Sequence, residues 1–188
     1  MKNGWTLLAG CVLLVCSSLA FAQAGKAGER STVAQVLDRG IGGVEGEFVP
    51  AADAMPEDKY SFTPSNGEFK GVRTFAQQVK HVAAVNYMIG AAILVEKPPL
   101  ELGGENGPDA IGSKADIMKF LKGSFTYLHK AVATVNEKNL VDPIKGPFGD
   151  RMVTRLGLSS SAAAHCFDHY GQMVEYLRMN GIIPPASR

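Results

Sequence analysis

The chain has 188 residues, with 19 Lys and Arg against 18 Asp and Glu, so its formal net charge is only +1. Its composition, 46% hydrophobic and 20% charged, is that of an ordinary globular domain and argues against a disordered chain. A nearly neutral chain lacks the basic surface by which proteins bind DNA or RNA, so we expect no nucleic-acid partner.

The first 22 residues have the pattern of an export signal. Lys2 supplies a positive start, residues 7–21 are mostly apolar, and Ala20-Phe21-Ala22 matches the small-x-small site of a signal peptidase. We predict cleavage after Ala22, a periplasmic or secreted protein, and no stable membrane insertion, because the apolar run is shorter than the ~20 residues of a span. Two alternatives remain, an uncleaved membrane anchor and a lipoprotein with its lipid on Cys11.

The chain after the cleavage site is expected to contain a leader and one domain. Residues 23–43 predict a flexible leader with a short helix, which the glycines at 40, 42 and 43 interrupt. The domain, residues 44–188, begins with a helix through Met55 in which Pro50 should introduce a kink. Cleavage would leave Cys166 as the only cysteine, so no intramolecular disulfide is expected.

Three more helices are predicted in the domain. Apolar residues recur at helical spacing over residues 72–95, and Ser113-Lys114-Ala115-Asp116 resembles a capping box that opens a helix to about Val135. The last helix begins at about Ser161, or one or two turns earlier, and ends at Asn180-Gly181. No stretch alternates for long enough to predict a strand. The expected fold is an all-α four-helix bundle with a long crossover connection.

Three of the four histidines could share one site. His165 and His169 are four residues apart, so they project from the same face of the last helix, together with Gln172 and Tyr176. His81 lies beside the apolar face of the 72–95 helix. This spacing leaves two interpretations open: a metal site, or core histidines whose hydrogen bonds are satisfied by Gln172, Tyr176 and the backbone.

The remaining candidate side chains fit such a site less well. His129 has no evident partner and is expected on the surface. Asp168 and Glu175 point away from the histidine face of the last helix, so the sequence offers no obvious general base. Cys166 is better explained as a small apolar residue in the core than as a nucleophile or a metal ligand.

Three stretches of the domain, 54–62, 73–83 and 165–185, occur in an order that resembles the DinB-like (DinB/YfiT) superfamily of metal-binding four-helix bundles. The resemblance implies one divalent ion held by a histidine of the second helix and two of the last, at the positions of His81, His165 and His169. Gln172 and Tyr176 would then orient a bound ligand or support the ion. We expect zinc or nickel, although a ligand set of three imidazoles suits several late transition metals.

The resemblance also implies a metal-dependent enzyme that acts on a small molecule. Relatives include thiol-dependent S-transferases and a maleylpyruvate isomerase in which the metal activates a small thiol, so we expect thiol S-transferase chemistry with a small thiol as a second cofactor. A metal-dependent hydrolase and a non-enzymatic metal- or ligand-binding bundle are the alternatives. Relatives often dimerise, so a homodimer is also expected.

Overall fold

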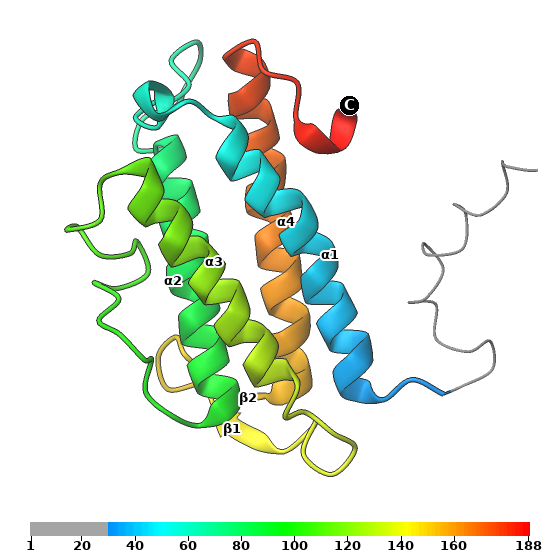
Figure 1. The fold of residues 1–188 in the computed structure, drawn as a ribbon. Coiled ribbons are helices and arrows are strands. Elements are labelled where there is room, and N and C mark those ends of the chain that lie inside the picture. Colours follow the sequence, from blue (N-terminus) through cyan, green and yellow to red (C-terminus); the bar gives the residue numbers. More distant parts are fainter. Residues whose placement is uncertain (1–29) are drawn as a thin grey trace, which may run out of the picture. The chain divides into compact units, whose positions relative to one another are not determined.

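The computed structural model of the protein describes residues 30–188. Four helices dominate it: α1 (Val33–Ala54), α2 (Phe75–Leu94), α3 (Lys114–Val132) and α4 (Arg155–Met179) (Figure 1). One 3-10 turn, Glu57–Lys59, lies between α1 and α2, and a second, Pro185–Ser187, follows α4. The predicted signal peptide, its cleavage site after Ala22, Cys11 and residues 23–29 of the predicted leader lie outside the described residues.

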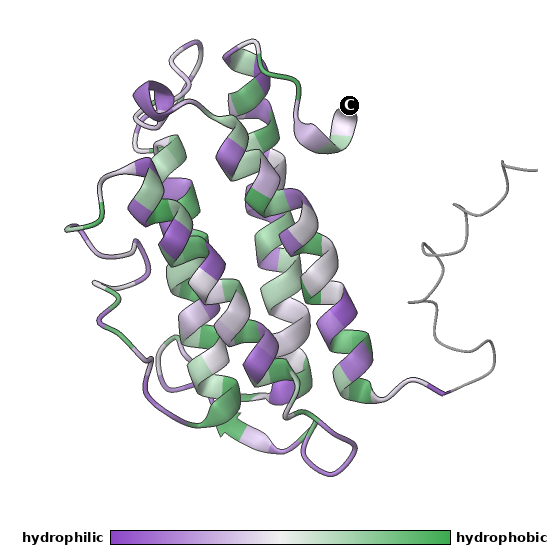
Figure 2. Ribbon diagram, viewed as in Figure 1, coloured by the Kyte–Doolittle hydropathy of each residue, from purple (hydrophilic) through white to green (hydrophobic). Residues whose placement is uncertain are grey.

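Each helix of the bundle packs against two others. Helix α2 contacts α3 and α4, and α1 contacts the same two helices from the other side (Figure 1). The connection from α1 to α2 therefore crosses the bundle, which confirms the predicted all-α fold with a crossover. Apolar and polar residues alternate along the helices (Figure 2), and the apolar ones meet in a core that includes Phe48 and Phe125, whose ring centroids are 6.3 Å apart.

The helix starts follow local capping chemistry. Thr32 caps α1 and Thr74 caps α2, each in a reciprocal capping box with the glutamine three residues later. Ser113 caps α3 by accepting a hydrogen bond from the backbone N–H of Asp116, as its tetrapeptide predicts. Within residues 30–188, no helix combines the length and the apolar character that crossing a membrane would require.

Helix α1 differs from its prediction. The glycines at 40, 42 and 43 do not interrupt it, and it continues past Pro50 to Ala54, so the predicted interruption of the helix at these glycines is wrong. A glycine costs a helix about 1 kcal/mol relative to alanine. One face of α1, with Ile41, Val44 and Phe48, is fully buried, and this burial outweighs the poor local propensity.

A short antiparallel hairpin precedes α4, although no strand was expected. Strands β1 (Pro143–Lys145) and β2 (Met152–Thr154) pair with Ile144 opposite Val153. Three residues per strand are too few to produce a recognisable alternation in the sequence. Helix α4 begins directly after β2, at Arg155, within the two-turn range that was predicted for its start.

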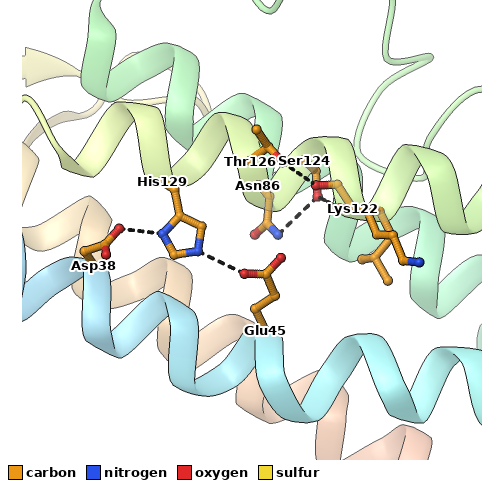
Figure 3. Close-up of polar contacts among 8 residues, drawn as sticks. Asp38, Glu45, Asn86, Lys122, Ser124, Thr126 and His129 are labelled. Carbon is orange, nitrogen blue, oxygen red and sulfur yellow. Dashed lines mark hydrogen bonds and ion pairs between the residues drawn. The ribbon is translucent and has the colours of Figure 1, made fainter. Parts of the chain in front are cut away.

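His129 also differs from its prediction, because it has two partners on a neighbouring helix. Its ring lies between Asp38 and Glu45 of α1, with Nδ1 2.5 Å from Asp38 Oδ1 and Nε2 3.0 Å from Glu45 Oε2 (Figure 3). His129 is more than 80 positions from each of the two carboxylates in sequence, so only the packing of α3 on α1 reveals the contact.

Candidate metal centre

The fold brings His81 of α2 together with His165 and His169 of α4. One ring nitrogen of each residue lies within 4.8 Å of those of the other two, and the ring centroids are 4.6–5.0 Å apart. His81 and His169 are buried and His165 is half-buried. Helix periodicity places His165 and His169 one turn apart on one face, while the packing of α2 on α4 supplies His81.

Two of these rings are oriented by acceptors on their outer nitrogens. Nδ1 of His81 donates to the backbone carbonyl of Glu105 at 2.6 Å, and Nδ1 of His169 donates to Oε1 of Gln78 at 2.6 Å. Because both acceptors are carbonyl oxygens, each Nδ1 must hold the proton of the neutral ring. The unprotonated Nε2 is then available as a ligand atom, and an outer hydrogen bond of this kind is the usual support of a metal-bound histidine.

The spacing of the nitrogens fits one small divalent ion. Nε2 of His81 lies 3.1 Å from Nε2 of His165. Two nitrogens at ~2.0–2.1 Å from one tetrahedral ion lie about 3.4 Å from each other, so only a small adjustment is needed. His165 differs from the other two because its Nδ1 is buried without a hydrogen-bond partner. Only contacts with the other two histidines can therefore determine which nitrogen of His165 holds the proton.

The environment keeps the three imidazoles neutral. The pKa of all three rings is lowered, and burial is the largest cause in each case. The pKa of His165 and His169 falls to about 4. The positive charge of Arg73 lowers the pKa of all three rings further, and Glu105 or Asp168 opposes these effects. A neutral imidazole has a free lone pair, which binding to a metal ion requires.

The loop between α2 and α3 holds the outer side of His81. Gly107 in this loop has φ +77°, and a Cβ atom there would lie 3.0 Å from Lys80 Cβ and 3.2 Å from the Lys80 carbonyl oxygen. Only glycine combines this backbone conformation with so close an approach to α2. The approach places the carbonyl of Glu105 against the ring of His81. The contact links residues 24 positions apart, so the periodicity of the sequence did not indicate it.

Gln172 and Tyr176 lie near the cluster, but neither bonds directly to a histidine. Gln172 accepts a hydrogen bond from Nε2 of Gln78 at 2.8 Å and donates to Asp168 at 3.0 Å, so it supports His169 through Gln78. The Tyr176 hydroxyl donates to the backbone carbonyl of Arg73 at 3.0 Å. Gln78 was not among the predicted site residues, because its contact with His169 joins positions 91 residues apart.

Cys166 faces the core and not the histidines. Its side chain is fully buried, its Sγ donates to Oδ1 of Asn86 at 3.3 Å, and burial raises the pKa of the thiol to about 12. A thiol that remains protonated and buried is a poor nucleophile and a poor metal ligand. The geometry agrees with the packing role that we expected for Cys166.

Comparison with known proteins supports the same fold. The family sequence model of the DinB superfamily matches residues 43–173 of the chain. Among solved structures, the crystal structure of a DinB-like protein from Bacillus subtilis, YjoA, is similar with a TM-score of 0.58 and 19% sequence identity, over 78% of this chain and 92% of that chain. At this identity the likeness concerns the fold alone. No curated protein matches the chain.

Proposed function

Because this chain belongs to the DinB superfamily, we propose that it is a divalent-metal-binding member of it, with His81, His165 and His169 as the ligands. One observation carries the proposal: three neutral imidazoles, two buried and one half-buried, meet within 4.8 Å, and two of them are oriented through Nδ1 so that Nε2 faces the cluster. Core histidines would need only hydrogen bonds, but Nδ1 of His165 has none.

We propose zinc or nickel as the ion, since imidazole nitrogen suits both. When bound, such an ion supplies a Lewis acid that polarises a carbonyl group or lowers the pKa of a thiol. Three protein nitrogens leave at least one position open to a small molecule, which is the arrangement of catalytic and not of structural sites. The carbonyl of Glu105 and the side chain of Gln78 orient two of the three ligands.

We propose a metal-dependent thiol S-transferase as the activity, with a small thiol as cosubstrate and a small electrophile as acceptor. The described residues provide no reactive thiol of their own, because Cys166 is buried and its pKa is raised to about 12. An external thiol therefore has to bring the sulfur. The neutral, partly buried histidine cluster is the described group best suited to receive it.

Elemental analysis of the purified protein tests the metal centre. We expect one divalent ion per wild-type chain and a sharp loss in the His81→Ala, His165→Ala and His169→Ala variants. His129→Gln is the matched control and should retain the ion, because His129 bonds to α1 and not to the cluster. Equal metal content in all five proteins would place the site elsewhere.

A thiol-consumption assay tests the proposed reaction. The metal-bound protein, a small thiol and an electrophile such as a haloarene should yield the thioether, as the carbon–halogen bond breaks and halide and a proton are released. The product should disappear in His169→Ala. Hydrolysis of the electrophile without loss of thiol would instead establish the alternative of a metal-dependent hydrolase. Full metal binding without turnover of any kind would favour a binding protein.

We also propose that the protein is exported and that it begins at Gln23 after cleavage. The support is the sequence pattern of residues 1–22 alone. The intact mass of the protein recovered from its native compartment tests the proposal. A mass that includes residues 1–22 would establish the uncleaved anchor, and a lipid adduct on Cys11 would establish the lipoprotein.

A further inference from the structure

Arg73 is a half-buried cation held by the same loop as His81 of the cluster, and it has no acidic partner among the described residues. It directly precedes Thr74, the N-cap of α2. Its Nε and Nη2 both donate to Oδ1 of Asn106, at 3.2 and 3.1 Å. A guanidinium group has five N–H donors, so this neutral partner leaves three of them for another acceptor.

Contacts from two directions fix Arg73 in this place. Asn106 follows Glu105, whose carbonyl accepts the hydrogen bond of His81, so one loop holds both the cation and a ring of the cluster. From α4, the Tyr176 hydroxyl donates to the backbone carbonyl of Arg73 at 3.0 Å. The charge of Arg73 acts on all three histidines and lowers the pKa of each.

A fixed cation beside a centre that binds a second cation is electrostatically unfavourable unless an anion lies between them. The nearby carboxylates of Asp168 and Glu105 act on the rings but do not pair with Arg73. Both are exposed to solvent. Their negative charges favour a singly charged ligand over a dianion.

We propose that Arg73 is the anion-binding residue of this site and that the small-molecule ligand presents a carboxylate to its free N–H donors. Arginine matches the planar geometry of a carboxylate, and such charge-assisted hydrogen bonds are about twice as strong as neutral ones. The carboxylate lies on the Arg73 side of the ligand, and the group that reacts lies toward the histidines. The inference rests on the proposed metal centre and specifies the substrate class that it takes.

The test uses the full chain with cobalt bound as a visible probe. Mercaptoacetate and 2-mercaptoethanol are titrated in turn, since only the first carries a carboxylate, and the ratio of their dissociation constants is the carboxylate preference. We expect this preference to fall about tenfold in Arg73→Gln relative to wild type. Arg151→Gln is the matched control, because Arg151 is exposed on the hairpin, and it should keep the wild-type preference.

The cobalt content of each protein separates the two levels of the proposal. If wild type binds no cobalt, the metal centre itself is wrong. If wild type and Arg73→Gln bind cobalt equally and have the same preference, the role of Arg73 alone is overturned. If Arg73→Gln does not bind cobalt, Arg73→Lys is tested instead, because lysine retains the charge but lacks the paired N–H donors of the guanidinium. A several-fold loss of the carboxylate preference in Arg73→Lys supports the inference, and an unchanged preference overturns it.

Discussion

Nδ1 of His129 on α3 lies 2.5 Å from a carboxylate oxygen of Asp38 on α1 (Figure 3). The other ring nitrogen lies 3.0 Å from Glu45, about two turns further along α1. Burial lowers the pKa of His129, but the hydrogen bonds and charges of the two carboxylates outweigh it and raise the pKa overall. A ring with an acceptor on each nitrogen is an imidazolium, so the contact is an ionic link between two helices.

The stability that His129 contributes should depend on pH. Because its pKa is higher in the folded than in the unfolded chain, its contribution is fully present below the unfolded value of ~6.5 and is lost as pH rises through the folded value. In urea unfolding, the free energy of unfolding of wild type should exceed that of His129→Gln by roughly 1 kcal/mol at acidic pH, and this difference should shrink at alkaline pH. The histidines of the cluster titrate equally in both proteins, so their contribution to the free energy of unfolding cancels in this difference. A difference independent of pH would contradict the ionic link.

Gln78 should control the affinity of the cluster for metal. Its Oε1 accepts the hydrogen bond of His169 Nδ1 at 2.6 Å and thereby fixes the ring and its tautomer. Gln78→Leu should weaken the binding of zinc about 10–100-fold, the usual effect of losing an outer partner of a metal ligand. Competition with a chelator of known affinity measures the change. Gln172→Ala leaves the bond between Gln78 and His169 in place and should have a smaller effect.

Gly107→Ala should disturb the support of His81 without touching a histidine. The new Cβ would lie 3.0 Å from Lys80 Cβ, in a backbone conformation with φ +77° that alanine rarely adopts. The loop must move, and the carbonyl of Glu105 moves with it, so we expect roughly 1–3 kcal/mol lower stability together with weaker metal binding.

Gly112→Ala is the matched control for that substitution. The site lies in the same connection between α2 and α3, but a Cβ there meets nothing within 4 Å. Thermal unfolding and metal affinity should therefore match wild type. Equal behaviour of the two alanine variants would show that the close approach at Gly107 is not needed for the site.

Cys166 should be inert in the folded protein. Its side chain is fully buried and its thiol pKa is raised to about 12, so alkylation by iodoacetamide at neutral pH should require unfolding. Mass spectrometry of the peptide that contains Cys166 measures the labelled fraction, with and without denaturant. Rapid labelling of the native protein would mean that α4 opens readily, and Cys166 would then be a candidate nucleophile.

Local signals in the sequence were sufficient for most of the helices and for two of the three histidines of the site. Apolar spacing over residues 72–95 indicated α2, Ser113 indicated the start of α3, and Asn180-Gly181 indicated the end of α4. These signals act within about one turn of helix, so they can be read without knowing the fold. The same is true of His165 and His169, whose shared face follows from a spacing of four residues.

Tertiary structure alone decided the rest. Burial of one face of α1 overrode the glycines that predicted a break, because the free energy of packing exceeds the loss of helix propensity. The partners of His129, the carbonyl that holds His81 and the place of Arg73 all depend on contacts between residues 24 to 103 positions apart. Periodicity describes one element at a time. Which faces meet depends on how four helices share a single core, and that is determined by the packing of the whole chain.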